Sequence, residues 1–206
     1  MSEEYLNNEA RVSYGIGRQM GDQLTANSFL GLDIKAVMAG MSDALNDEPS
    51  AVADEDMEAA FMAMEEQMKA QQAVGAKGHA VEGEEFLFLN SKREEVTVTA
   101  SGLQYEILTN GEGEKPTAAA TVRTHYKGAL LDGTVFDSSY DRGQPAEFPV
   151  NGVIAGWTEA LQKMAVGSKW RLFVPSDLAY GERGAGGAIG PNATLVFDVE
   201  LLAIVG

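Results

Sequence analysis

The sequence of 206 residues contains no cysteine, which excludes disulfide bonds, thiolate metal ligands and a cysteine nucleophile. Basic residues are scarce, because 15 Lys and Arg stand against 31 Asp and Glu, giving a net charge of −16. A phosphate backbone repels so acidic a chain, so we expect no nucleic-acid partner. The sequence also lacks a run of 18 or more apolar residues, so we expect no membrane-spanning helix and no membrane partner.

Motifs for several kinds of chemistry are missing as well. The start of the chain lacks the basic and apolar segments of a secretory signal, which predicts a cytoplasmic location. There is no phosphate-binding loop, no GxSxG motif and no HExxH motif. His79 and His125 are the only histidines, too few for a histidine-rich metal site, so we expect neither metal nor cofactor.

What is present divides into two halves. Residues 1–100 carry 19 acidic and 7 basic side chains, a net charge of −12, whereas residues 101–206 have a net charge of −4. The first half holds eight of the nine methionines and one proline, and the second holds both tryptophans and short runs of Val, Thr, Phe and Tyr. This change predicts an α+β protein in which an all-α domain precedes a β-rich domain.

Three helices are expected in the first half, because apolar residues recur there at helical spacing. They cover about residues 8–24, 33–45 and 54–93. Asp33 is placed to cap the second helix, and Asp54 begins an acidic first turn of the third. At about 1.5 Å per residue, the third helix would be roughly 60 Å long, wider than a globular core. We therefore interpret it as a linking helix.

Glycines interrupt this linking helix. Gly75, Gly78 and Gly83 each cost about 1 kcal/mol relative to alanine. They predict a weak point between residues 74 and 84, which would be either a solvated stretch that tolerates glycine or a hinge. An apolar stripe at Met57, Phe61, Met64 and Met68 is equally open to two interpretations. It would either pack against the first two helices or bind varied partners, since methionine adapts to irregular surfaces.

The predicted domains are a helical dimerisation domain over 1–50, the linking helix over 51–95 and a β-rich domain over 96–206. About 45 helical residues bury too little surface to form a core of their own. Intertwining with a second copy of the same segment would supply the missing surface. We therefore expect a homodimer through residues 1–50.

The second half shows the pattern of strands and turns. It predicts an antiparallel sheet of about five strands with one short helix against it. The expected strands and the hairpin fall at residues 103–108, 121–126, 131–134, 169–174 and 194–204. The expected helix covers residues 156–164, the one segment of this half with helical period.

Five motifs of this half resemble the FKBP-type peptidyl-prolyl isomerases in order and spacing. They are His125-Tyr126-Lys127-Gly128, Asp132-Gly133-Thr134-Val135-Phe136-Asp137-Ser138-Ser139, Val153-Ile154-Ala155-Gly156-Trp157, Leu178-Ala179-Tyr180-Gly181 and Ala193-Thr194-Leu195-Val196-Phe197-Asp198-Val199-Glu200-Leu201. The first half is similar to the helical domain of the dimeric bacterial subgroup of that family. This subgroup includes macrophage infectivity potentiator proteins and cytoplasmic 22-kDa members. The resemblance implies an FKBP fold and a peptidyl-prolyl cis-trans isomerase.

The resemblance also implies an aromatic pocket that works without a covalent intermediate or a metal. The residues implied in catalysis are Asp137, Tyr180, Trp157, Phe136 and Tyr126. Those implied in substrate binding are Ile154, Val153, Phe148, Phe197, Ile189 and Arg142. Trp157 would receive the proline ring, while the Ile154 N–H and the Tyr180 hydroxyl would bind peptide carbonyls. Asp137 would lie near the twisting amide, held by Arg142 and Tyr126.

Two positions depart from the family pattern. Ala146 stands where the family often has an aromatic residue, so one wall of the pocket should be shallower. Gly190-Pro191 stands where the family often has Pro-Pro, and with Gly184, Gly186 and Gly187 it predicts a mobile loop after Tyr180.

The resemblance implies proline-containing peptides and unfolded proteins as substrates, and the macrolides tacrolimus and rapamycin as inhibitors. A second hypothesis stays open, that of a dimeric holdase chaperone in which isomerase activity is secondary. In the first hypothesis a V-shaped homodimer would also bind client proteins in the manner of a chaperone.

Overall fold

The computed structural model describes residues 7–26 and 31–205 and forms two compact units, Met1–Phe61 and Met62–Gly206. The outer limits of the predicted domains, Met1 and Gly206, lie outside the described residues. Within the described part of the chain, no helix has the length and apolarity needed to cross a bilayer.

The first unit contains helices α1 (Asn8–Ala26) and α2 (Ile34–Leu45) and the start of α3 (Asp54–Asn90). Asp33 caps α2, because its carboxylate accepts hydrogen bonds from the N–H groups of Lys35 and Ala36 at 2.8 and 3.3 Å. These helices match the expected ranges, with α3 ending three residues earlier than expected.

The apolar stripes of α1 and α2 lie on the surface. Among their residues whose side chains the structure describes, none is buried. Val12 is 63% exposed and Ile16 is 55% exposed, and Leu45, at the end of α2, reaches 81%. The first unit therefore forms helices with a clear apolar period but without a core that covers it.

Helix α3 passes through its glycines without a break. Gly75 and Gly78 have open space around them, so the weak point expected there stays a prediction. Gly83 is buried, and a Cβ on it would collide with the hydroxyl of Thr194. This glycine therefore permits close packing of α3 against the second unit's loop 181–194.

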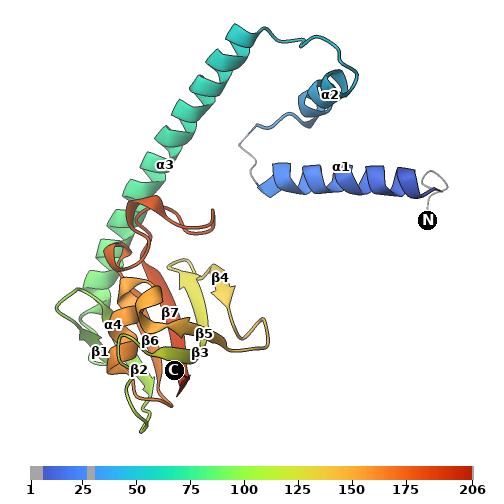
Figure 1. Ribbon diagram of the computed structural model, residues 1–206. Coiled ribbons are helices and arrows are strands. Elements are labelled where there is room, and N and C mark those ends of the chain that lie inside the picture. The colour runs from blue at the N-terminus through green and yellow to red at the C-terminus, as the bar shows by residue number, and fades with distance from the viewer. Residues whose placement is uncertain (1–6, 27–30, 206) are drawn as a thin grey trace. The chain divides into compact units, whose positions relative to one another are not determined.

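The second unit is built on one antiparallel sheet of seven strands that packs one face against α4 (Ala155–Lys163) (Figure 1). The order is β1-β2-β6-β7-β3-β4, with β5 also paired to β3. The strands are β1 (Val96–Val98), β2 (Gln104–Thr109), β3 (Thr121–Leu130), β4 (Val135–Ser138), β5 (Ala146–Pro149), β6 (Lys169–Val174) and β7 (Leu195–Ile204).

The predicted α+β fold is thereby confirmed, with seven strands where about five were expected. The two strands missed, β1 and β5, have only three and four residues, at or below the shortest length at which alternation identifies a strand. The core lies between the sheet and α4, where Leu161, Leu172 and Val199 are fully buried. This core holds α4 against the sheet and so fixes the cavity described below.

Candidate functional site

A cavity of about 480 Å³ opens where the first turn of α4 meets strands β3, β4, β5 and β7. Its walls are almost entirely apolar, with one carboxylate among them. The lining residues are Tyr126, Phe136, Asp137, Phe148, Gly152, Val153, Ile154, Trp157, Tyr180 and Phe197. Nine of these ten were expected from the sequence, and Gly152 is the addition. The structure thus brings together side chains that come from segments 71 residues apart at their extremes.

Trp157 lines the base of this cavity and is 4% exposed. Three aromatic rings meet its indole at nearly right angles, with centroid distances of 5.2 Å to Tyr126, 5.9 Å to Phe148 and 5.4 Å to Phe197. Edge-to-face pairs of this kind add about 0.5–1.5 kcal/mol each to the burial of the rings. The cavity is therefore a firmly packed apolar site with a fixed indole at its base.

The one carboxylate of the cavity, Asp137, is held by two donors. The Tyr126 phenol donates to Asp137 Oδ2 at 2.5 Å, and the Arg142 guanidinium forms an ion pair with Oδ1. Arg142 also donates to the Tyr126 oxygen at 2.9 Å. Burial alone would raise the pKa of Asp137, but the hydrogen bonds from Tyr126 and Arg142 outweigh it and lower that pKa. Asp137 is therefore an ionised acceptor at neutral pH.

The pKa of Tyr126 is raised, first by burial of the phenol and then by its hydrogen bond to Asp137. Its backbone is fixed by Ser139, whose hydroxyl accepts from the Tyr126 N–H at 2.8 Å and whose own N–H donates to the Tyr126 carbonyl at 2.9 Å. Sequence reasoning did not assign this supporting role to Ser139. The Asp-Ser-Ser run of the motif was the signal that could have indicated it.

Three hydrogen-bond donors of cavity-lining residues have no acceptor in the described part of the chain, and one of them, the indole N–H of Trp157, is buried. Ile154 is the N-cap of α4, and its N–H meets no acceptor in the described part of the chain. The Tyr180 hydroxyl, on a side chain that is 40% exposed, likewise meets none there. Both donors belong to residues that line the cavity, so they are available to carbonyl groups of a bound molecule.

Two sequence-predicted residues lie outside the lining. Arg142 is behind Asp137, as described above. Ile189 is 7% exposed and packs in the hydrophobic core, where its carbonyl and N–H pair with Ala185. Ala146 is partly buried against the same core and pairs with Thr124 of β3. The structure therefore places Ile189 in support of the site and not at the cavity surface.

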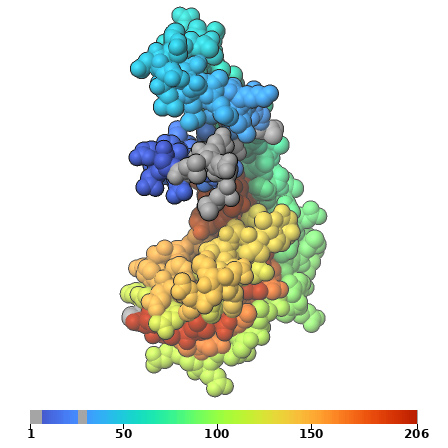
Figure 2. Space-filling view, turned by 90° about the vertical axis from the view of Figure 1, so that its right-hand side faces the viewer, coloured from blue at the N-terminus to red at the C-terminus, as the bar shows by residue number. Residues whose placement is uncertain are grey.

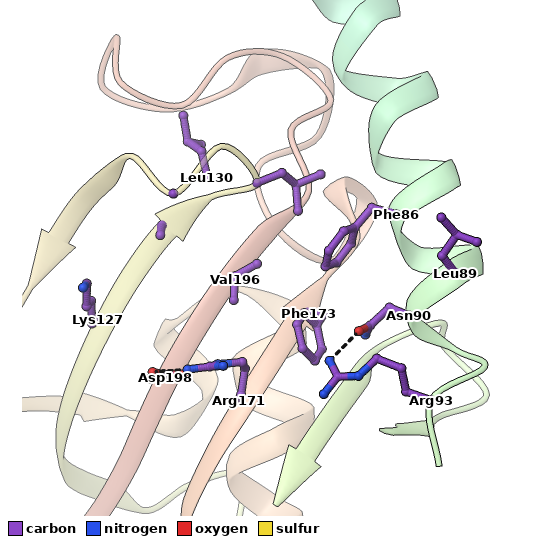
Figure 3. A pocket seen from close by; sticks show the side chains of 13 residues that line it. Phe86, Leu89, Asn90, Arg93, Lys127, Leu130, Arg171, Phe173, Val196 and Asp198 are labelled. Atoms are coloured by element: carbon purple, nitrogen blue, oxygen red, sulfur yellow. Dashed lines mark hydrogen bonds and ion pairs between the residues drawn. The ribbon is translucent and has the colours of Figure 1, made fainter. Parts of the chain in front are cut away.

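A second hollow, of about 580 Å³, lies between α3 and the other face of the sheet (Figure 3). Most of its charged groups are paired, since Arg171 bonds Asp198 at 2.6 Å and Arg93 bonds Glu95 and Glu106 at 2.6 and 2.9 Å. Lys127, on β3, is the lining cation without an ion pair among the described residues. In the space-filling view the segment around residue 130 (yellow) reaches the green part of α3 (Figure 2). This hollow is the junction of a helix with a sheet, and its lining, with a single unpaired lysine, holds no pair of groups suited to acid–base or nucleophilic chemistry.

The first cavity can bind an extended chain with an apolar ring but offers little for bond cleavage. It contains no serine, lysine or histidine to act as a nucleophile or general base. Across the residues that the structure describes, no cluster of three or more His, Asp and Glu could bind a metal ion. An apolar floor, one fixed carboxylate and the free donors of Ile154, Tyr180 and Trp157 suit a reaction in which a bound group changes conformation.

Comparison with known proteins gives concordant results. Residues 112–202 match the family described as FKBP-type peptidyl-prolyl cis-trans isomerase, and residues 9–107 match the domain amino-terminal to such isomerases. The chain is 51% identical over 197 residues to the FKBP-type 22 kDa peptidyl-prolyl cis-trans isomerase of Escherichia coli K12, covering 96% of each chain.

It is 39% identical over 198 residues to the protein of Legionella longbeachae named outer membrane protein MIP, covering 94% of this chain and 84% of that one. Among solved structures, FkpA from Escherichia coli matches with a TM-score of 0.67 and 36% identity, over 97% of this chain and 98% of that chain. These matches extend over both units of the chain.

Proposed function

The chain belongs to the FKBP-type peptidyl-prolyl cis-trans isomerases, and from this premise we propose that the cavity around Trp157 is its catalytic site. The observation that supports this most is the lining itself, an aromatic cavity with Asp137 as its single carboxylate. The substrates of this enzyme class are proline-containing peptides. Trp157, at the base of the cavity, would receive the proline ring.

The chemistry of such a site follows from the nature of the X–Pro bond. Rotation about it meets a barrier of about 20 kcal/mol, because the nitrogen lone pair is delocalised into the carbonyl. The planar amide is therefore more polar than the twisted one. A cavity with apolar walls destabilises the planar form relative to the twisted transition state, which is differential binding. To accelerate the isomerisation about 10⁵-fold, this differential binding needs to lower the activation free energy by only about 7 kcal/mol.

The polar groups of the cavity would orient the chain around the twisting bond. We assign the Ile154 N–H and the Tyr180 hydroxyl to carbonyls of the bound peptide, because both are free donors at the cavity. Asp137 would face the amide as a fixed negative charge. Its orientation is set by Tyr126 and Arg142, which occupy one carboxylate oxygen each.

We also propose that the chain is a homodimer through residues 1–50. The support is physical: the described part of α1 and α2 has clear apolar stripes but no buried residue. Met38 of α2 is 66% exposed and Ile16 of α1 is 55% exposed. Such a set of apolar side chains would be covered most simply by the same helices of a second copy.

The dimer would give the enzyme a second way to hold a client. Of the stripe Met57, Phe61, Met64 and Met68, three residues are exposed, with Met57 at 38%, Phe61 at 70% and Met68 at 44%, which favours the view that this stripe contacts unfolded chains. We propose chaperone-like client binding in addition to catalysis, by a V-shaped dimer. The same exposure supports the alternative of a holdase in which the Trp157 cavity is secondary.

Two further proposals concern inhibitors and compartment. Tacrolimus and rapamycin should bind in the Trp157 cavity, which a quench of tryptophan fluorescence on titration would test. We propose the cytoplasm as the location, which fractionation of cells that produce the full-length protein would test.

The isomerase and holdase proposals are separated by measuring two activities on one variant. Asp137→Leu should slow proline-limited refolding of a client while its aggregation is suppressed as before. Equal refolding rates for the variant and the parent would favour the holdase.

A further inference from the structure

The loop over residues 181–194, which follows Tyr180, lies against the middle of α3 (Figure 1). His79 Nδ1 is 3.0 Å from the carbonyl oxygen of Pro191. A carbonyl can only accept, so Nδ1 carries the proton and donates. Asn192 Nδ2 lies 3.5 Å from the carbonyl oxygen of Ala76, one turn earlier on the same helix. The loop is therefore bonded to α3 at two successive residues.

The packing at this contact leaves no room for side chains. A Cβ on Gly190 would lie 2.5 Å from His79 Cε1 and 2.9 Å from His79 Nδ1. On the helix, Gly83 offers the same close approach to Thr194, which is buried. The sequence suggested that Gly190 makes the loop mobile. The structure indicates a different role for Gly190, because any side chain at this position would collide with the His79 ring.

The end of helix α3, C-terminal to this contact, is anchored on the sheet (Figure 3). Near its end, buried Asn90 donates to the side chain of Gln104 at 2.9 Å, and Gln104 donates to the Leu87 carbonyl at 2.9 Å. One turn before, the ring of Phe86 packs against Phe173 with a centroid distance of 5.7 Å. The helix that carries His79 is thus fixed to the sheet about three turns away from it.

The peptide group between Pro191 and Asn192 transmits this contact toward the cavity. Its carbonyl accepts from His79, and its N–H donates to the carbonyl of Gly181 at 2.8 Å. Gly181 directly follows Tyr180, whose side chain lines the cavity. Hydrogen bonds made through one peptide group polarise each other, so the bond to His79 strengthens the bond to Gly181.

We propose that His79 is a positioning residue for the isomerase reaction. By holding the peptide group of Pro191 and Asn192, it fixes Gly181 and so sets the position of the Tyr180 hydroxyl at the cavity. The role of His79 rests on the proposed role of Tyr180. It also makes a segment of α3, outside the sheet and its loops, part of the catalytic machinery.

The test uses the full-length protein and a proline-containing tetrapeptide as substrate. His79→Leu removes the donor and should lower kcat/KM about three- to tenfold. His79→Asn places an amide nitrogen near the position of Nδ1 and should restore most of the loss. Lys77→Leu introduces the same side chain at an exposed position two residues earlier and should leave kcat/KM unchanged.

A merely structural role for His79 is distinguished by combining it with Tyr180→Phe. If His79 acts through the Tyr180 hydroxyl, His79→Leu should change kcat/KM less than twofold once that hydroxyl is gone. If His79→Leu lowers kcat/KM by the same factor in the Tyr180→Phe protein as in the parent, the inference is overturned. An unchanged kcat/KM in the His79→Leu single variant would overturn it as well. No effect of Tyr180→Phe alone would instead contradict the proposed role of Tyr180, and the inference with it. If His79→Leu fails to fold, Gly190→Ala replaces it in this test, because the added methyl group displaces the His79 ring while residue 79 stays a histidine.

Discussion

Tyr126 and Asp137, eleven residues apart in the chain, are joined by a hydrogen bond of 2.5 Å from the phenol to the carboxylate. Because Arg142 bonds both of them, the three side chains form one closed network at the edge of the Trp157 cavity. This network keeps the only carboxylate of the cavity ionised and fixed. Its loss should therefore be visible in how activity depends on pH.

Tyr126→Phe removes one of the two donors to Asp137. The folded-state pKa of Asp137 is below its ordinary value, so its ionised form stabilises the fold above the unfolded pKa, about 3.9. That stability is lost as the pH falls through the folded pKa. In Tyr126→Phe we expect the folded pKa to rise, so activity should fall at a higher pH than in the parent.

Carboxyl-detected NMR titration of Asp137 and the acid limb of kcat/KM measure this shift. Tyr105→Phe is a matched control, since Tyr105 stacks on Trp170 and is not among the cavity residues. An acid limb that is identical in Tyr126→Phe and the parent would contradict the role of the network.

Ile16→Glu places a charge in the exposed apolar stripe of α1. If a second copy covers this stripe, burying an unpaired carboxylate there is costly, and the variant should sediment as a monomer. Arg18→Glu introduces the same side chain on the other side of the helix and should remain dimeric. A parent protein that sediments as a monomer at micromolar concentration would refute the dimer outright.

Gly190→Ala should lower kcat/KM, because the added methyl group displaces the His79 ring from the Pro191 carbonyl. In a chain that already carries His79→Ala, the methyl group has space, and Gly190→Ala should then have little further effect. Steady-state kinetics of the two single variants and the double variant measure this coupling. Independent, multiplicative losses would show that Gly190 and His79 do not act together.

Removal of residues 1–61 separates the two proposed activities. The remaining unit keeps α3 from Met62 onward, with His79 and its contacts, so turnover of a tetrapeptide should stay within about twofold of the parent. The catalysed refolding rate of a whole unfolded protein should fall, because the shortened chain lacks the dimerisation helices and the start of α3 that are proposed to bind the client. Circular dichroism first establishes that the shortened chain is folded, and an equal loss on both substrates would contradict this division of labour.

The cavity could be predicted because its residues belong to short, local motifs, such as Val153-Ile154-Ala155-Gly156-Trp157. The contact between His79 and Pro191 could not, since the two residues are 112 positions apart and neither lies in a pattern that points to the other. In the sequence alone, a glycine is interpreted as a flexible position, because the residues that pack against it are not known. Gly83 and Gly190 are instead places where helix and loop approach closely, and only the assembled fold shows which explanation applies.

Two further features, the burial of one side chain and one short strand, were not predicted from the sequence. Ile189 was expected at the cavity surface, but its bonds to Ala185 turn it into the core. Strand β5 alternates in burial, but it was missed because it has only four residues and one of them is a proline, which is unusual within a strand.

The most direct test of the account is proline-limited refolding catalysed by Asp137→Leu, with aggregation of the client measured on the same samples. Asp137 and Arg142 are both more than 40% exposed, so the fold should lose at most about 1 kcal/mol with their ion pair. Asp141→Leu, an exposed position four residues on, is the control.

The account predicts at least a tenfold fall in the catalysed refolding rate for Asp137→Leu, with unchanged suppression of aggregation and a normal rate for Asp141→Leu. An Asp137→Leu protein that accelerates refolding as well as the parent would contradict the claim that the Trp157 cavity is the catalytic site.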